Sequence, residues 1–189
     1  MPEEIIDVCD ADGKRTGERK PKWAVHRDGD WHRAVHVWIV TPEIRILLQK
    51  RASLKENYPG LWDVSFAGHL SAGESARDAA IREGAEEIGT DVSEDSFEYV
   101  TTTREVVVLN GGRYRDNEVH EIYVVRRPVD PATLRLQKEE VDEVRLVSLD
   151  ELARLTSSPD SGLVPHEAEY RALLQYLEAD PGSQPRRGD

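Results

Sequence analysis

Short runs of β-branched and aromatic residues alternate with turn residues along most of the chain, a pattern typical of sheet proteins. The run at residues 4–9 is followed by a segment rich in Asp and Gly at 10–18, which predicts a strand and then a turn. The runs at 35–40 and 45–50 are separated by Thr-Pro-Glu and predict a hairpin that anchors the central sheet. Further strands are expected at 61–67, 98–109, 119–126 and 143–147, with a loop at 110–118.

A helix is predicted at residues 75–88, because this segment lacks proline, is rich in Ala, Glu and Arg, and is followed by a glycine. Small or aliphatic residues recur at every fourth position on one side of it, namely at Ala76, Ala80, Gly84 and Ile88. A glycine inside a helix costs roughly 1 kcal/mol relative to alanine. We therefore expect Gly84 to allow close packing of this helix against the sheet.

Two more helices are predicted, a short one at 149–155 and a terminal one at 166–178. The last segment, 179–189, offers no apolar face to bury and is expected to be disordered. The length of the chain suits one ordinary domain, which we place at residues 1–178.

Composition and charge narrow the classes of partner. With 37 acidic and 25 basic residues the formal net charge is −12, which opposes non-specific binding to nucleic acids or to anionic membranes. No apolar run approaches the roughly 18 residues of a membrane-spanning helix, and the first residues lack the pattern of a signal peptide. We therefore expect a cytoplasmic protein. The single cysteine, Cys9, excludes an internal disulfide and is interpreted as a buried free thiol.

Three carboxylates in the predicted helix share one side, since Glu83, Glu86 and Glu87 stand at positions i, i+3 and i+4. Like charges this close repel each other, which a solvated acidic face can tolerate. The alternative is a metal site, because Mg²⁺ prefers oxygen ligands and commonly bridges carboxylates to substrate phosphates.

The segment at 68–90, GHLSAGESARDAAIREGAEEIGT, resembles the Nudix box, in which a Gly, a Glu, an Arg-Glu pair, a Glu-Glu pair and a second Gly stand at set spacings. These fixed positions are filled by Gly68, Glu74, Arg82, Glu83, Glu86, Glu87 and Gly89. Two positions that are aliphatic in the family hold Gly84 and Thr90 instead, a departure that concerns packing more than chemistry.

The resemblance implies a fold and a cofactor. The fold is of the α/β class, an α/β/α sandwich around a mixed β-sheet, and the cofactor is Mg²⁺, with Mn²⁺ as a possible substitute. The ligands it implies are the carboxylates of Glu83, Glu86 and Glu87 and the carbonyl of Gly68. It also implies that Glu74 pairs with Arg82 to fix the loop on the helix.

Similarity over residues 4–178 extends to a relative with the same fold, isopentenyl diphosphate isomerase. The shared pieces are the segment 22–26, His32, Arg51, Lys55, Gly68-His69 and Asp116-Asn117-Glu118. The isomerase needs a cysteine immediately before its Gly-His pair, where this chain has Ala67. The isomerase also keeps only the last of the helix glutamates, whereas this chain has all three. Alanine does no acid–base chemistry. Hydrolysis is therefore favoured, with an isomerase-like enzyme and a non-catalytic nucleotide-binding module as alternatives.

Hydrolysis by attack of water on phosphorus needs a base, and two candidates stay open. Helix geometry places Glu86 near the metals, whereas Glu118 lies in a predicted loop that the family often uses to bring a base into the site. Asp116 is interpreted as a turn residue. Arg51 and Lys55 match the diphosphate-binding positions of the isomerase and are expected to bind phosphate, Arg51 through a bidentate guanidinium.

His26, His32 and His69 resemble the histidine ligands of the isomerase, although the first two are one residue closer together here. Both a second metal centre and ordinary structural histidines stay open for them. The other three histidines, at positions 36, 120 and 166, carry no pattern that indicates a role. The expected partner is a small-molecule diphosphate, a nucleoside diphosphate or its derivative, and neither its identity nor the oligomeric state follows from the sequence.

Overall fold

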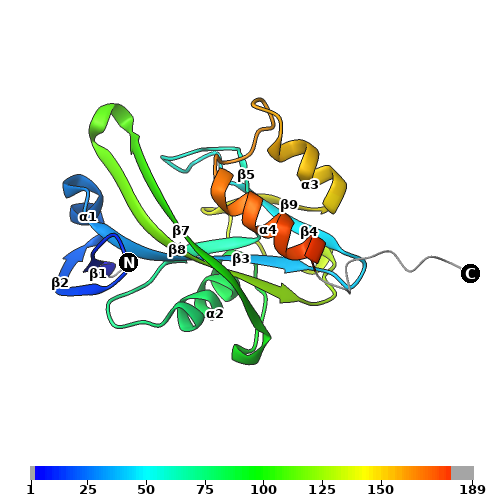
Figure 1. The fold of residues 1–189 in the computed structure, drawn as a ribbon, viewed down its shortest axis with the longest axis horizontal. Coiled ribbons are helices and arrows are strands. Elements are labelled where there is room, and N and C mark those ends of the chain that lie inside the picture. The colour runs from blue at the N-terminus through cyan, green and yellow to red at the C-terminus, as the bar shows by residue number, and fades with distance from the viewer. Residues whose placement is uncertain (1–2, 180–189) are drawn as a thin grey trace, which may run out of the picture.

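The computed structural model describes residues 3–179 and contains nine strands and four α-helices in that range (Figure 1). The strands are β1 (Ile5–Cys9), β2 (Arg15–Pro21), β3 (Trp31–Val40), β4 (Arg45–Arg51), β5 (Trp62–Asp63), β6 (Phe66–His69), β7 (Phe97–Leu109), β8 (Tyr114–Arg126) and β9 (Val141–Ser148). The helices are α1 (Lys22–Asp28), α2 (Ala76–Glu87), α3 (Leu149–Thr156) and α4 (Glu167–Ala179). None of these helices has the length and apolar character that crossing a membrane requires.

The strands form one mixed sheet with two branches. In the first branch β3 pairs in parallel with β8 from Trp31↔Asn117 to Val40↔Arg126, and antiparallel with β6, while β7 continues antiparallel beyond β8. In the second branch β4 pairs antiparallel with β9 and β5. β3 and β4 are paired only at Val40↔Ile46. The predicted hairpin is therefore present, but its two strands diverge from the turn and open a space between the branches.

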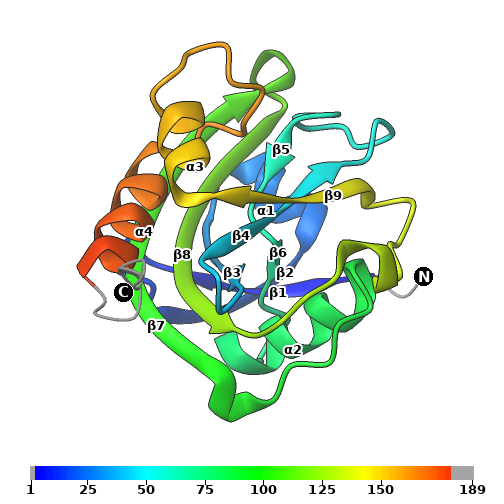
Figure 2. The same ribbon diagram turned by 90° about the vertical axis from the view of Figure 1, so that its right-hand side faces the viewer.

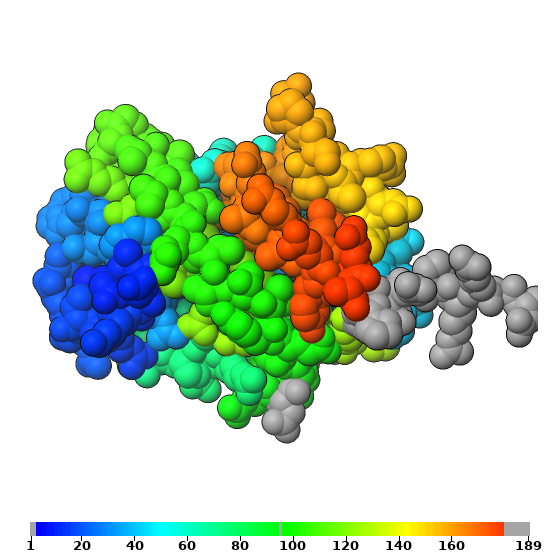
Figure 3. All heavy atoms as spheres, viewed as in Figure 1, coloured from blue at the N-terminus to red at the C-terminus, as the bar shows by residue number. Residues whose placement is uncertain are grey.

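Helix α2 covers one face of the sheet, and α4 with α3 covers the other (Figures 1 and 2). Alternate β3 side chains point to opposite faces. Val35 and Val37 pack with Phe66 and α2 in one core, whereas Trp38 and Val40 pack with α4 in the other. On the surface, α4 lies directly against β7 (Figure 3). These two cores confirm the α/β/α sandwich around a mixed sheet.

Helix α2 begins and ends as its sequence predicts. The Ser75 side chain caps it by accepting a hydrogen bond from the Asp78 amide at 3.2 Å, and Gly89 beyond its last turn has the left-handed φ of 65° that favours glycine. A β-carbon on Gly84 would lie 3.1 Å from both Phe66 Cζ and Thr90 Cγ2. The close packing expected of this helix is confirmed, and the two atypical positions of the box, Gly84 and Thr90, pack against each other.

Two elements are absent from the sequence-based prediction, β2 and α1. Most β2 side chains are exposed, so the strand shows no alternation of apolar and polar residues, and β2 occupies part of the predicted turn at 10–18. Helix α1 has only seven residues, too few to establish a helical period. The predicted strand at 61–67 is also divided, since Ser65 interrupts it and its hydroxyl donates to the Leu47 carbonyl at 2.6 Å.

The interpretation of Asp116 as a turn residue is wrong. β8 starts at Tyr114, so most of the predicted loop at 110–118 is strand, and Asp116 lies opposite Val107 of β7. For the same reason Glu118 is a strand residue, not a loop residue. Cys9 is buried and free as expected. Of the tail predicted at 179–189, Ala179 closes α4 and the other residues lie outside the described part of the chain.

Glu74 and Arg82 form the pair that the sequence predicts between the loop and helix α2. Arg82 donates through Nε and Nη2 to the two carboxylate oxygens of Glu74, both at 3.0 Å, and through Nη2 to the His69 carbonyl at 3.0 Å. The Ser71 amide adds a hydrogen bond of 2.8 Å to Glu74. Burial raises the pKa of Glu74, but the Arg82 and Ser71 bonds outweigh burial and lower that pKa below its usual 4.5.

We predict that Glu74→Gln lowers the free energy of unfolding at pH 7 by about 1.5–3 kcal/mol, the range for hydrogen bonds to charged groups. A carboxyl with a lowered pKa in the folded state stabilises above its usual pKa and loses this effect as the pH falls. The difference between variant and wild type should therefore shrink below about pH 4.5. Denaturant titrations across this pH range test the prediction. Glu43→Gln, at an exposed position in the β3–β4 turn, is the control, and a pH-independent loss would contradict the pairing.

Candidate active site

A pocket of about 1010 Å³ opens between the two branches of the sheet. Ala34 and His36 line it from the β3 branch, and Arg51 and Asp63 line it from the β4 branch. The pocket brings together most of the residues that the sequence analysis selects: Arg51, Lys55, Gly68, His69, Arg82, Glu83, Glu86, Glu87, Asp116 and Glu118. Residues distant in the sequence thus meet around one cavity.

The glutamates of α2 form one wall of the pocket and differ in their exposure. Burial raises the pKa of Glu83 to about 7 against the opposing charge of Arg82. Burial and the nearby charge of Glu83 raise the pKa of Glu87 to about 8. The Glu86 side chain is 55% exposed. Buried carboxyls of this kind ionise readily only when a cation lies beside them, which favours a cation site at Glu83 and Glu87.

Strand β6 passes close to these carboxylates. A β-carbon on Gly68 would lie 2.0 Å from Glu83 Oε1, so only glycine allows Glu83 to approach the backbone here. The Gln49 side chain donates to Glu87 Oε2 at 3.2 Å, and Arg82 lies 2.6 Å from Glu83 and 3.5 Å from Glu86. In residues 3–179 the three α2 glutamates are not among the groups whose ligand atoms converge within 4.8 Å.

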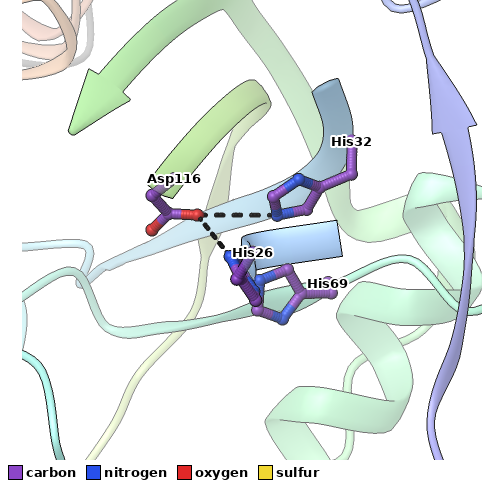
Figure 4. A group of neighbouring side chains, drawn as sticks. All are labelled: His26, His32, His69 and Asp116. Carbon is purple, nitrogen blue, oxygen red and sulfur yellow. Dashed lines mark ion pairs between the residues drawn. The ribbon is translucent and has the colours of Figure 1, made fainter. Parts of the chain in front are cut away.

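A cluster of histidines lies beside the pocket, and we call His26, His32, His69 and Asp116 the histidine centre (Figure 4). Of these four residues, His69 and Asp116 line the pocket. Their ligand atoms lie within 4.8 Å of one another. Asp116 Oδ1 is 3.2 Å from His26 Nδ1 and 3.6 Å from His32 Nε2. Gly29, with a φ of 74°, turns the chain back after α1, so the His26 and His32 rings lie 4.7 Å apart. The shorter sequence spacing therefore does not prevent the histidines from gathering.

The inward-facing atoms of the histidine centre lack hydrogen bonds. In the described part of the chain, His26 Nδ1, His32 Nε2 and Asp116 Oδ1 are buried and make no hydrogen bond; their contacts are the ionic ones with each other and, for His32 Nε2, with Glu118. The other nitrogens are held from behind: His32 Nδ1 lies 3.1 Å from the Asp30 carbonyl and His26 Nε2 lies 3.1 Å from the Tyr114 hydroxyl. A metal-binding histidine commonly donates its second N–H to such a partner. The residues present thus fit a divalent metal.

Glu118 connects the histidine centre to a deeper histidine. Its Oε1 lies 3.1 Å from His69 Nε2 and 3.3 Å from His32 Nε2, and its Oε2 lies 2.9 Å from His120 Nε2. Burial raises the pKa of Glu118, but these imidazoles outweigh burial and hold the pKa well below its usual range. Glu118 is therefore an anionic anchor between imidazoles.

The two expected phosphate-binding cations line the pocket but already have acidic partners. Arg51 Nη1 lies 3.0 Å from Asp63 Oδ2, and Arg51 Nε donates to the Asn57 carbonyl at 3.2 Å. Lys55 is paired with Glu140. A phosphate group would have to compete with these carboxylates or be bound in addition to them.

A further group of buried or partly buried residues, which no sequence pattern predicts, lies at the inner end of the pocket. His36, His120 and His166 lie beside Glu105 and Glu169, and two sets drawn from these five have ligand atoms within 4.8 Å. They come from β3, β7, β8 and the segment at α4. No local pattern indicates such a group, because its members meet only when these elements pack.

Comparisons with known proteins agree with this geometry. A family model described as a NUDIX domain matches residues 30–174. The chain is 41% identical over 182 residues to Nudix hydrolase 3 of Arabidopsis thaliana, covering 94% of this chain but only 24% of that protein. It is 33% identical over 189 residues to an uncharacterised Nudix hydrolase of Clostridium acetobutylicum, covering 95% of this chain and 90% of the relative.

Two further similarities concern the isomerase relatives and the fold. The isopentenyl-diphosphate delta-isomerase of Clavibacter michiganensis is 32% identical over 157 residues, covering 80% of this chain and 77% of that enzyme. A crystal structure of a Deinococcus radiodurans protein superimposes with a TM-score of 0.67 at 16% identity, covering 89% of this chain and 98% of that one. The Nudix box that ends on α2, the sandwich fold and the matched family domain lead to one conclusion: the chain belongs to the Nudix family.

Proposed function

We propose that this Nudix protein hydrolyses a diphosphate linkage in a nucleoside diphosphate or a derivative of one, with Mg²⁺ or Mn²⁺ as cofactor. The observation that carries the proposal is that one pocket is lined both by the α2 glutamates and by His69 and Asp116 of the histidine centre. The volume of about 1010 Å³ lies at the upper end for small-molecule pockets, so a group larger than diphosphate fits.

On the helix wall, Glu83, Glu86, Glu87 and the Gly68 carbonyl would hold the metal that contacts the diphosphate. A divalent ion there neutralises phosphate charge and lowers the pKa of bound water. Arg82 orients the site by holding the carboxylate of Glu83 at 2.6 Å.

At the histidine centre, His26, His32, His69 and Asp116 would hold a second ion. The unpartnered atoms of this centre support the assignment, because a buried polar atom without a partner costs about 1–3 kcal/mol. A bound cation would remove that cost.

Of the two candidate bases, we assign the role to Glu86. Glu118 has three imidazole partners within 3.3 Å, and a carboxylate held this way accepts a proton poorly. Glu86 lines the pocket, is 55% exposed and has only a 3.5 Å contact with Arg82, so its carboxylate can reach a bound water. Glu118 then acts as an anchor or ligand of the histidine centre.

Phosphate binding is assigned to Arg51 and Lys55, which lie on the pocket wall opposite the β3 branch. The guanidinium of Arg51 presents a fork that matches phosphate oxygens. Its present partner, Asp63, keeps it pointed toward the pocket at 3.0 Å.

The isomerase alternative rests on similarity to the Clavibacter enzyme. At the position before Gly68-His69, however, the pocket presents the methyl group of Ala67. A methyl group neither donates nor accepts a proton, so it leaves the allylic transfer without one of its acid–base groups.

We predict that turnover of a nucleoside diphosphate requires Mg²⁺ or Mn²⁺, because both walls of the pocket offer ligands that are charged or unpartnered until a cation binds. Phosphate release should stop in excess chelator and return when metal is restored. Full turnover in excess chelator would refute the metal-dependent mechanism. Absence of turnover on a broad panel of diphosphates with metal would instead support a non-catalytic binding module.

We predict that Glu87→Gln abolishes turnover with the fold intact and raises the Mg²⁺ concentration needed for any residual rate, because the amide keeps the size of the side chain and removes the charge. Glu86→Gln should lower kcat by roughly 10²–10⁴-fold, the loss typical of a positioned base, and should weaken metal binding less than Glu87→Gln does, because Glu86 is the more exposed of the two ligands. Steady-state rates and calorimetric metal titrations separate the two roles. Glu139→Gln, at an exposed position outside the pocket, is the control.

Glu118→Gln completes this series. Because Glu118 anchors the histidine centre, the Glu118→Gln substitution should lower metal affinity together with the rate. A rate loss at Glu118 with unchanged metal affinity, and none at Glu86, would transfer the base role to Glu118. If Glu87→Gln keeps the wild-type rate and metal affinity, the α2 glutamates are not a metal site.

We predict no isomerase activity on isopentenyl diphosphate, because Ala67 cannot exchange a proton. Product analysis for dimethylallyl diphosphate, with metal present and a nucleoside diphosphate as the positive control for folded protein, makes the test. Formation of dimethylallyl diphosphate at enzymatic rates would overturn the choice of hydrolase over isomerase.

A further inference from the structure

A third set of potential ligands lies at the inner end of the pocket, apart from the α2 glutamates and the histidine centre. It consists of Glu105 on β7, His120 on β8 and His166 just before α4, and we call it the inner triad. The ligand atoms of these three side chains lie within 4.8 Å of one another. Glu105 and His166 line the pocket, so an ion from solvent can reach them.

One ring nitrogen of His120 has a hydrogen-bond partner and the other has none. Its Nε2 lies 2.9 Å from Glu118 Oε2, and because a carboxylate only accepts, this nitrogen carries the hydrogen. Its Nδ1 is buried and has no hydrogen-bond partner among the described residues. The whole residue is 1% exposed. A bare imidazole lone pair in such a position is a ready metal ligand.

His166 lies between two carboxylates. Its Nδ1 is 2.7 Å from Glu105 Oε2, and its Nε2 is 3.4 Å from Asp63 Oδ1. If Asp63 accepts the Nε2 hydrogen, a lone pair on Nδ1 faces a carboxylate oxygen, and this contact is favourable only with a positive charge between them. That charge is either a proton on Nδ1 or a metal ion.

The surroundings favour the metal ion. Both histidines are backed by a carboxylate, Glu118 behind His120 and Asp63 behind His166, which is the arrangement that orients metal-binding imidazoles. His36 stacks on His120 with ring centroids 4.0 Å apart and fixes the plane of that ring. The ligands are therefore already oriented before an ion arrives.

A neighbouring set, His36, His120 and Glu169, also converges within 4.8 Å but is less suitable. The His36 and His120 rings are stacked 4.0 Å apart and inclined by only 23°, so their lone pairs lie in nearly parallel planes, which disfavours binding of one ion by both rings. Both oxygens of Glu169 have partners, one in His36 Nδ1 and one in Trp38 Nε1, each at 2.7 Å. We therefore select the inner triad.

We propose that Glu105, His120 and His166 form an additional binding site for a divalent first-row transition metal ion such as Zn²⁺, separate from the Mg²⁺ site on α2. Two imidazoles and one carboxylate suit such ions and leave positions open toward the pocket. The site shares the Glu118–His120 contact with the histidine centre, so the two centres are adjacent but use different ligands.

The experiment counts metal ions per chain. Wild type, His166→Gln, His26→Gln and the double variant are dialysed against Zn²⁺ and analysed by elemental mass spectrometry, and Co²⁺ replaces Zn²⁺ for visible absorption spectra. His26→Gln removes a ligand of the histidine centre only. We expect His166→Gln to lose one equivalent of ion, His26→Gln to lose a different one with a distinct Co²⁺ spectrum, and the double variant to lose both.

Two variants on β7 serve as a second test of the site and as its control. Glu105→Gln should lose the same ion as His166→Gln, and it serves if thermal melting shows that His166→Gln does not fold. Glu98→Gln, which removes a carboxylate elsewhere on the strand, should retain wild-type metal content. Unchanged stoichiometry and Co²⁺ spectra in folded His166→Gln and Glu105→Gln would overturn the proposal and leave a buried ion-pair network held by a protonated His166.

Discussion

The parallel register between β3 and β8 is the constraint on which both histidine groups depend. It places His32 beside Glu118 and Ala34 beside His120. Because side chains alternate along a strand, His32 and His36 of β3 point to the same face as Asp116, Glu118 and His120 of β8. A shift of one residue would send one set to the opposite face. The same face carries Trp38 and Val40 into the core under α4, so hydrophobic burial holds the register that positions the polar groups.

The divergence of β3 and β4 creates the pocket, and the register between β3 and β8 positions polar side chains that line it. The two strands are paired only at Val40↔Ile46, and the opening between the branches admits Glu87 from α2 and Arg51 from the end of β4. Close approach on the helix side depends on glycine: Gly68 makes room for the carboxylate of Glu83, and Gly84 lets α2 press on Phe66. Packing therefore holds the α2 glutamates against the sheet. Burial raises the pKa of Glu83 and Glu87, so a bound cation would stabilise their charged forms.

The inner part of the pocket departs from what a hydrocarbon substrate would need. His36, Asp63, Glu105 and His166 line it, and each is polar. An apolar tail would offer these groups no hydrogen bond or ionic contact and would shield them from water, which is unfavourable for polar side chains. Together with Ala67, this lining supports hydrolysis of a polar diphosphate within a family that also has isomerase relatives.

Local features of the sequence determined helix α2 and its C-terminal glycine, the Nudix box with its ligand candidates, the Glu74–Arg82 pair and the absence of a cysteine at Ala67. Each depends on residues within a few turns of one another. Local features did not predict that residues 114–118 form a strand, because polar strand residues that face a pocket have the composition of a loop. The contacts of Asp116 and Glu118 could not be predicted for the same reason. Only the tertiary structure gathered the histidines: His166 and Glu105 stand 61 residues apart, and no local pattern records a meeting that long-range strand pairing and α4 packing produce.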